Sequence, residues 1–310
     1  MPILLCKGEL DNWPHWKQAL ESRMPELEVR IWPDLSDPRE IEYVLIWTPV
    51  DDVLHSLPNL KVIFSLGAGV DHLLQQPGMR WDLPIVRMVD PALTEGVSEY
   101  VLFHVLRYHR RMPEYEVLQR ERSWRQLRQI TPQERKVGIM GLGVIGADTA
   151  GKLATLGFDV AGWSRISGGL LGVECFQGRE QLTPFLARTE ILVCLLPLTA
   201  ETDGIIDRQT LEALPRGAYL INAARGGHVV ENDLLAALDS GHISGATLDV
   251  FATEPLPKDH PFWDHPKVTV TPHIASLTNP STASAQIIDN VRRHQRGEPL
   301  TDLVNVTRGY

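Results

Sequence analysis

Residues 136–146 read KVGIMGLGVIG, an apolar run of strand length that leads into three glycines spaced as G-x-G-x-x-G. In this pattern Gly141 allows a tight turn, Gly143 lets a phosphate approach the backbone, and Gly146 lets the following helix lie close to the strand. The N-terminus of that helix offers unpaired N–H groups and the positive end of its dipole to an anion. Glycines also serve packing alone, but their position between a strand and a helix predicts a dinucleotide-binding site.

Residues 159–165, DVAGWSR, end where such a site usually presents an acidic residue to the ribose of NAD. Ser164 and Arg165 stand there instead, and a hydroxyl beside a guanidinium suits a phosphate. A charge-assisted hydrogen bond to phosphate is worth about 1.5–3 kcal/mol, which corresponds to a preference for NADP on the order of 10- to 100-fold. The alternative is an arginine that simply faces solvent from a loop.

Short apolar runs alternate with helical patterns along the whole chain. Because most of these runs are apolar at every position, they are typical of strands in a parallel sheet that helices cover on both faces. We therefore predict an α/β protein with two doubly wound parallel-sheet domains, one Rossmann and one flavodoxin-like. The expected strands are residues 3–7, 29–32, 43–47, 61–67 and 84–88 in the first part, and residues 136–140, 159–163, 191–195, 218–222, 245–249 and 267–270 in the second.

The length of 310 residues fits two domains better than one core. Shorter helical patterns occur at residues 15–23 and 51–57, and residues 95–111 predict a long apolar helix that bridges the domains. The tail from about residue 280 to the final RGY is expected to be helical and to return to the first domain. The predicted boundaries are residues 1–100 with 280–310 for a discontinuous first domain, and residues 101–279 for the Rossmann domain.

The composition is typical of a globular protein outside membranes, with 43% apolar and 22% charged residues. We find no apolar run of the roughly 18 residues that a membrane span needs, and no signal peptide. Cys6, Cys175 and Cys194 lie far apart in the sequence, which predicts a reducing compartment, the cytoplasm, and no structural zinc or other metal site.

The net charge of −9 argues against a nucleic-acid partner. Residues 107–128 are locally basic, and we expect them to form a helix surface that faces solvent or a protein partner.

Three ionisable residues follow strands of the predicted Rossmann domain. Arg225 comes after the strand at 218–222, Glu254 after the one at 245–249, and His273 after the one at 267–270. Each residue alone has an ordinary explanation, such as a local ion pair, a solvated loop acid or a capping histidine. Ligands of open α/β sheets bind at the carboxyl ends of the strands, so the three together predict an active site.

Six motifs complete the pattern: SLGAGVDH (65–72), GLGVIG (141–146), CLLPLTAET (194–202), INAARGGHVV (221–230), LDVFATEPLP (248–257) and TPHIAS (271–276). With them the sequence resembles the D-isomer-specific 2-hydroxyacid dehydrogenase family over essentially its whole length, and most closely its glyoxylate/hydroxypyruvate reductase branch. The resemblance implies NADPH-dependent reduction of small 2-oxo acids, glyoxylate to glycolate and hydroxypyruvate to D-glycerate. It also implies a substrate-binding domain built from both chain ends, and a homodimer formed mainly through the nucleotide-binding domain.

The resemblance further implies which residues form the site. Arg225, Glu254 and His273 would be catalytic. Beyond the three glycines, Ser164 and Arg165, the implied cofactor contacts are Val144, Ile145, Leu196, Pro197, Thr202, Ala223, Ala224 and Asp249, the last of them through the nicotinamide amide. The implied substrate contacts are Trp47, Gly67, Ala68, Gly69 and Arg225.

These roles agree with the chemistry of the reaction. Arg225 can bind the carboxylate of a 2-oxo acid and polarise its ketone, while His273 can protonate the developing alkoxide. Glu254 would orient the imidazole and favour its protonated form. The backbone N–H groups of the small residues 67–69 can converge on an anion, although an ordinary glycine turn would look the same.

Trp47, at the end of an apolar strand, is either a wall of the substrate pocket that restricts substrate size or a core aromatic. The main alternative function has the same fold, because the sequence also resembles the C-terminal-binding-protein corepressors, in which nucleotide binding supports protein assembly. Their long disordered extension has no counterpart here. A dehydrogenase for a different D-2-hydroxy acid stays open, and a formate dehydrogenase is disfavoured because that branch has no counterpart of Glu254.

Overall fold

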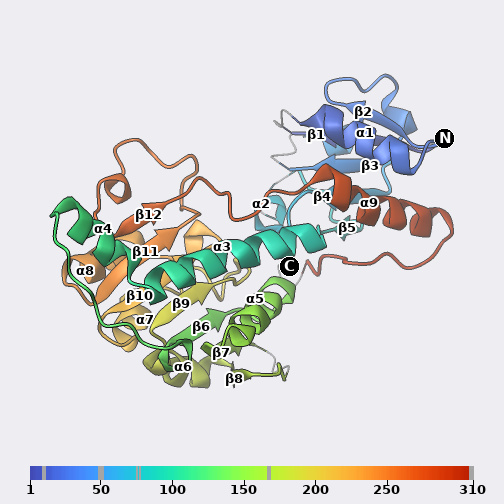
Figure 1. The fold of residues 1–310 in the computed structure, drawn as a ribbon. Helices are drawn as coiled ribbons and strands as arrows, with labels where there is room; N and C mark the ends of the chain where they lie inside the picture. The colour runs from blue at the N-terminus through green and yellow to red at the C-terminus, as the bar shows by residue number, and fades with distance from the viewer. Residues whose placement is uncertain (9–11, 48–51, 75, 77, 166–168, 307–310) are drawn as a thin grey trace. The chain divides into compact units, whose positions relative to one another are not determined.

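The computed structural model describes residues 1–8, 12–47, 52–74, 76, 78–165 and 169–306. The chain divides into two compact units, which we call the first unit (Met1–Leu93 with Thr278–Tyr310) and the second unit (Thr94–Leu277). Figure 1 shows each unit as a sheet flanked by helices. No helix in the described part of the chain has both the length and the apolar character needed to cross a bilayer.

The first unit contains a parallel sheet with the order β2-β1-β3-β4-β5 among its described residues. This is the strand order of a flavodoxin-like doubly wound sheet, which confirms the predicted class. Every residue of β1, β4 and β5 is buried, as expected for strands covered on both faces. The strands are β1 (Ile3–Lys7), β2 (Glu28–Ile31), β3 (Ile41–Ile46), β4 (Val62–Ser65) and β5 (Ile85–Val86).

Helices from both ends of the chain pack in the first unit. Arg23, the last residue of α1, donates a hydrogen bond from Nε to Ser284 Oγ of α9, and Tyr43 Oη on β3 is 2.9 Å from His294 Nδ1 of α9. The C-terminal segment therefore belongs to the first unit. The helices are α1 (Trp13–Arg23), α2 (Asp71–Leu74) and α9 (Pro280–Gln295), with short 3-10 turns at Pro38–Glu40 and Asp52–Ser56.

The second unit contains a wholly parallel sheet with the order β12-β11-β10-β9-β6-β7-β8 in the residues described. The chain starts in the middle at β6, builds outward to β8, and then returns to β9 on the other side. This is the Rossmann order, with its switch point between β6 and β9. The strands are β6 (Lys136–Met140), β7 (Asp159–Ser164), β8 (Val173–Gln177), β9 (Ile191–Cys194), β10 (Ala218–Asn222), β11 (Ile243–Leu248) and β12 (Val268–Val270).

Helix α3 is anchored to the second sheet through aromatic side chains. Tyr108 stacks on Tyr219 of β10 with ring centroids 4.2 Å apart, and its hydroxyl is 2.7 Å from Thr247 Oγ1 of β11. The helices of this part are α3 (Pro91–His109), α4 (Met112–Arg120), α5 (Val144–Thr155), α6 (Leu182–Arg188), α7 (Arg208–Ala213) and α8 (Glu231–Asp239). Further 3-10 turns lie at Pro132–Glu134, Arg179–Gln181, Gly226–His228 and Pro261–Trp263.

Several predicted elements were wrong in detail. The second sheet gains β8, whose sequence VECFQ is partly exposed along its length and gives no continuous apolar run. The helix expected at 95–111 begins four residues earlier and ends at His109, because Arg111 adopts a left-handed conformation with φ 58° before α4. The basic stretch 107–128 is therefore not one helix, and residues 121–131, which we call the arm, form neither helix nor strand.

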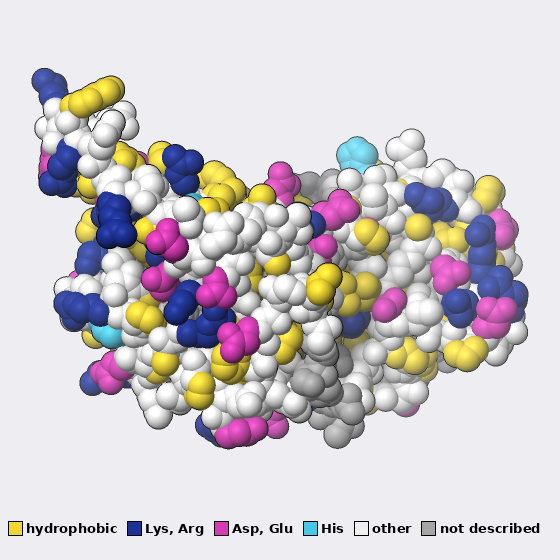
Figure 2. Space-filling model, turned by 60° about the horizontal axis from the view of Figure 1, so that its bottom comes forward, with side chains coloured by type: hydrophobic (Ala, Val, Ile, Leu, Met, Phe, Trp, Pro, Cys, Tyr) yellow, Lys and Arg dark blue, Asp and Glu magenta, His cyan; other side chains and the backbone are white. Residues whose placement is uncertain are grey.

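Two more helical segments are shorter than predicted. The pattern at residues 51–57 forms the 3-10 turn Asp52–Ser56, and residue 51 lies outside the described residues. The tail is helical only to Gln295, since Gly297 has φ 68° and ends the helix, and residues 296–306 are irregular. The last four residues, 307–310, lie outside the described part. On the face drawn in Figure 2, basic and acidic side chains are interspersed.

Candidate active site

The carboxyl ends of the Rossmann strands bring the predicted site residues of the second unit to one edge of the sheet. Gly141 follows β6, Arg165 follows β7, and Leu196 follows β9. Arg225, Glu254 and His273 come after β10, β11 and β12 in the same way (Figure 1). Because these strands are parallel neighbours, residues that are more than 130 positions apart in the sequence share this edge.

The glycine turn between β6 and α5 has the geometry that a dinucleotide needs. Gly141 has φ 99°, and a Cβ there would lie 2.7 Å from the Leu195 carbonyl oxygen. A Cβ on Gly146 would lie 1.8 Å from the Gly141 carbonyl oxygen, so α5 can approach the turn only with glycine at this position. A Cβ on Gly143 would meet nothing within 4 Å. The space at Gly143 is therefore open to a ligand, and the other two glycines shape the turn.

The N-terminus of α5 and the end of β7 offer groups that fit a phosphorylated dinucleotide. Gly143 is the N-cap of α5 and no side chain caps the helix, so its first N–H groups stay available to a pyrophosphate. Arg165 is 48% exposed, and its Nη1 lies 3.8 Å from Oε2 of the still more exposed Glu201. Such an exposed ion pair is weak, so a phosphate can replace the carboxylate.

Glu254 and His273 are hydrogen-bonded to each other near Arg225. Glu254 Oε2 is 2.8 Å from His273 Nδ1, and Glu254 Oε1 accepts a hydrogen bond of 3.0 Å from the Phe251 N–H. Burial tends to raise the pKa of Glu254, but the His273 imidazole, the Phe251 N–H and the charge of Arg225 outweigh it and hold this pKa below its ordinary value. The Glu254 carboxylate is therefore ionised at neutral pH and accepts a hydrogen bond from the N–H at Nδ1 of His273.

The loop that carries His273 is held by Asp249, which is almost completely buried. Its carboxylate accepts hydrogen bonds from Thr271 Oγ1 at 2.6 Å, from the Ile274 N–H at 2.9 Å and from the Ala275 N–H at 2.8 Å. Tyr100 Oη of α3 lies 2.6 Å from Thr271 Oγ1. Because the Thr271 hydroxyl donates its proton to Asp249, it accepts a hydrogen bond from the Tyr100 hydroxyl. Burial raises the pKa of Tyr100. We did not predict this network, in which Asp249 anchors the loop.

The loop that carries Arg225 is held by Asn222 and His228. The Arg225 carbonyl oxygen accepts a hydrogen bond of 2.9 Å from Asn222 Nδ2 and lies 3.0 Å from His228 Nδ1. His228 Nε2 lies 3.3 Å from the Pro197 carbonyl oxygen, so the buried ring connects the loops after β9 and β10. Burial tends to lower the pKa of His228, but the Cys194 sulfur and these two carbonyls raise it to about 9. No signal in the sequence points to this role, since His228 is one histidine within a motif.

The other predicted cofactor residues lie in the turns at this edge. The side chains of Leu196 and Ala224 are buried in the core of the second unit, which leaves their backbone at the edge. Thr202 donates a hydrogen bond of 2.7 Å from Oγ1 to the Pro197 carbonyl oxygen and so closes the loop after β9. Three more are at least partly accessible to solvent, namely Val144, Ile145 and Ala223. No cluster of metal-ligating side chains occurs among the residues described.

The predicted substrate residues of the first unit also lie together. Trp47 packs over Gly67, where a Cβ would lie 2.6 Å from the indole. The ring centroids of Trp47 and His72 are 5.1 Å apart. Trp47 is only partly buried, which argues against a purely core role. The Gly67 N–H already donates to Ser65 Oγ at 3.2 Å. An anion in this turn would therefore depend on Ala68 and Gly69.

Comparison with known proteins agrees with this geometry. The D-isomer specific 2-hydroxyacid dehydrogenase, NAD binding domain, matches residues 102–275. Glyoxylate/hydroxypyruvate reductase A from Serratia proteamaculans is 44% identical over 304 residues, which cover 96% of this chain and 97% of that protein.

Two solved structures are similar over almost the entire chain. A D-isomer specific 2-hydroxyacid dehydrogenase from Xanthobacter autotrophicus Py2, in complex with NADPH and MES, has a TM-score of 0.96 and 45% identity, and the match covers 100% of this chain and 99% of that one. An NADPH-dependent glyoxylate/hydroxypyruvate reductase from Sinorhizobium meliloti, in complex with NADP and sulfate, has a TM-score of 0.94 and 39% identity, with 100% of both chains covered. The resemblance seen in the motifs is thus confirmed, and the chain belongs to the D-isomer-specific 2-hydroxyacid dehydrogenase family.

Proposed function

We propose that this protein is an NADPH-dependent reductase of small 2-oxo acids that converts glyoxylate to glycolate and hydroxypyruvate to D-glycerate. The observation that carries the proposal is the Glu254–His273 hydrogen bond near Arg225, at the same sheet edge as the glycine turn. The names of the relatives, glyoxylate/hydroxypyruvate reductase A among them, support the substrate class. The solved relatives that contain NADPH or NADP support the cofactor.

The residues at this edge suit the reduction of a ketone. Bound NADPH would supply the hydride. His273 uses Nδ1 to bind Glu254, so its Nε2–H is the group that can donate a proton to the developing alkoxide. Arg225 carries a fixed positive charge and a planar set of donors, which binds the substrate carboxylate and polarises the ketone oxygen. Glu254 holds the ring orientation and stabilises the imidazolium before the proton is donated.

The direct test measures the loss of NADPH absorbance with a panel of 2-oxo acids, and repeats it with NADH. We expect glyoxylate and hydroxypyruvate to give the highest kcat/KM, and NADPH to be preferred by about 10- to 100-fold. Failure to oxidise NADPH with every 2-oxo acid, in a protein that still binds NADPH, would favour a nucleotide-dependent binding protein instead.

We assign substrate size selection to Trp47, on the basis of its packing over the 65–69 turn and its partial exposure. A rigid indole beside the substrate leaves room only for short side chains. Trp47→Ala should therefore raise kcat/KM for phenylpyruvate relative to glyoxylate. If the ratio stays constant while the melting temperature falls, Trp47 is structural, with an expected loss of about 3–5 kcal/mol.

We also propose that the protein is a homodimer through the second unit and that it functions in the cytoplasm. Exposed large apolar side chains cluster along one stretch of this unit, and burying them would favour a dimer: Phe103, Leu106, Met112, Val117 and Trp124. Trp124, on the arm, is fully exposed. Sedimentation of the wild type and of Trp124→Ala tests the dimer. Cys6, Cys175 and Cys194 form no disulfide in the structure, as expected in a reducing compartment.

A further inference from the structure

A pocket of about 450 Å³ lies at the opposite edge of the second sheet from the candidate active site. Arg135 precedes β6, Gly217 precedes β10, and Ser244 is at the start of β11, so the pocket adjoins the amino ends of these strands. Strands of five or six residues separate it from the carboxyl edge by about 15 Å. Its other walls come from the end of α3, the start of α4 and the arm.

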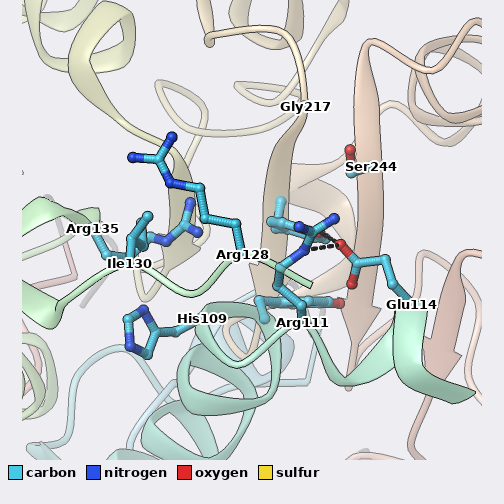
Figure 3. A pocket seen from close by; sticks show the side chains of 10 residues that line it. His109, Arg111, Glu114, Arg128, Ile130, Arg135, Gly217 and Ser244 are labelled. Carbon is cyan, nitrogen blue, oxygen red and sulfur yellow. Dashed lines mark hydrogen bonds and ion pairs between the residues drawn. The ribbon is translucent and has the colours of Figure 1, made fainter. Parts of the chain in front are cut away.

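Positive charge dominates the pocket. Arg111, Arg128 and Arg135 all line it, and Glu114 is the acidic residue of the lining. Figure 3 shows Arg128 and Arg135 on one side above His109, and the Arg111–Glu114 ion pair on the other side. Arg135 is also paired with Glu190, with Nη1 and Oε2 3.2 Å apart. Arg128 is exposed, so a ligand in the pocket can reach its guanidinium.

The pocket also contains buried polar atoms that lack a hydrogen-bond partner among the described residues. Arg135 Nε and His109 Nδ1 are two of them, and the His109 side chain is more than nine-tenths buried. Burial, with the charges of Arg135 and Arg110, lowers the pKa of His109, so the ring is neutral and can present an N–H on Nδ1. The third atom is Glu114 Oε2, an acceptor, since Arg111 and Tyr219 use only Oε1. Buried groups of this kind normally have partners.

From this geometry we propose that the pocket binds a small hydroxylated oxyanion, either a hydroxy-polycarboxylate or a polyol phosphate. The anionic group would be held by Arg128, Arg135 Nε–H and His109, and a ligand hydroxyl would donate to Glu114 Oε2. The volume is within the usual range for sites of small ligands. The requirement for a hydroxyl distinguishes this ligand from a simple counterion, because Glu114 repels an anion that has no proton to donate.

The test uses the full protein saturated with NADP⁺, so that the dinucleotide site is filled, at constant ionic strength. Calorimetry would measure binding of citrate, of tricarballylate, which lacks the citrate hydroxyl, and of glycerol 3-phosphate. Arg128→Ala removes one charge from the pocket. Arg125→Ala removes an exposed arginine of the same arm outside the pocket, and serves as the matched control.

We expect Arg128→Ala to weaken citrate or glycerol 3-phosphate binding by about 10- to 100-fold, while Arg125→Ala changes it less than threefold. Tricarballylate should bind the wild type about tenfold more weakly than citrate. Whichever of citrate and glycerol 3-phosphate binds more tightly identifies the anionic group. Equal binding to both arginine variants, or equal affinity for citrate and tricarballylate, overturns the proposal. The proposal is also overturned if the wild type binds neither ligand and the Arg128→Glu variant is no longer a dimer. A second copy of the chain would then be what fills the pocket.

Discussion

His273 has a backbone conformation that its neighbours must enforce. Its φ of 54° lies in the left-handed region, which residues other than glycine rarely adopt. The His273 N–H donates to the Asp249 carbonyl oxygen at 2.8 Å, and the Asp249 carboxylate holds the residues on both sides. Strain of this kind persists where the surrounding structure fixes it, and it is common at functional sites. The conformation therefore supports a role for His273 in chemistry rather than in packing.

The first prediction at this scale concerns proton donation. His273→Ala should lower kcat by about 10²- to 10⁴-fold, because it removes the proposed proton donor, while NADPH binding is retained. Arg225→Ala should also raise KM for the 2-oxo acid, since we propose that Arg225 binds the ground-state carboxylate. Steady-state kinetics with glyoxylate and a fluorescence titration with NADPH measure the two effects. A His273→Ala enzyme with nearly normal kcat would refute the assignment.

The second prediction concerns the choice of cofactor. The double variant Ser164→Asp with Arg165→Ala places a carboxylate where the 2′-phosphate of NADPH is expected and removes its cation. NADPH should then bind at least tenfold more weakly, whereas NADH should bind as well as before or better. Dissociation constants for both cofactors are the measurement, and NADH is the internal control. Equal losses for both would show that these residues do not bind the phosphate.

At the scale of elements, we expect two glycines at the start of α5 to have different roles, one in the stability of the fold and the other in cofactor binding. Gly146→Ala would bring a methyl group to 1.8 Å from the Gly141 carbonyl oxygen, so the helix must move. We expect a loss of about 1–3 kcal/mol or more in the free energy of unfolding. Gly143→Ala meets no protein atom and should cost about 1 kcal/mol or less, yet weaken NADPH about tenfold or more. Chemical denaturation and NADPH titration of both variants test this, and equal stability losses would contradict it.

Sequence patterns predict the bounds of some strands and helices better than those of others. Strands buried on both faces, such as β9 and β10, were predicted to within one residue because every position is buried and all but Asn222 are apolar. The edge strand β8 was missed because Glu174 and Gln177 interrupt its apolar residues, and none of its five positions is fully buried. The break between α3 and α4 occurs at the left-handed Arg111, two residues before Pro113, which has no backbone N–H with which to continue α3.

At the scale of the whole molecule, the motifs predicted which strand ends form the site, since parallel topology brings them to one edge. They could not predict which side chains hold the loops in place. The Tyr100 to Thr271 contact joins positions 171 residues apart and depends on how α3 packs on the sheet. His228 is comparable, because its two carbonyl partners belong to loops that only the folded sheet brings together.

The pH dependence of unfolding should report the charge on His228. Its pKa is raised to about 9 in the folded protein, above the ordinary histidine value of 6.5. The imidazolium therefore stabilises the fold fully below about pH 6.5, and this contribution is lost as the pH rises through about 9. His228→Gln keeps a hydrogen-bond donor without the charge, so its unfolding free energy should lie furthest below the wild type at pH 6 and approach it by pH 10. Denaturation of both proteins across this range is the measurement, and taking the difference cancels the other titrating groups. A gap that is constant with pH would mean that the buried ring is neutral and joins the loops after β9 and β10 by its shape and a single hydrogen bond.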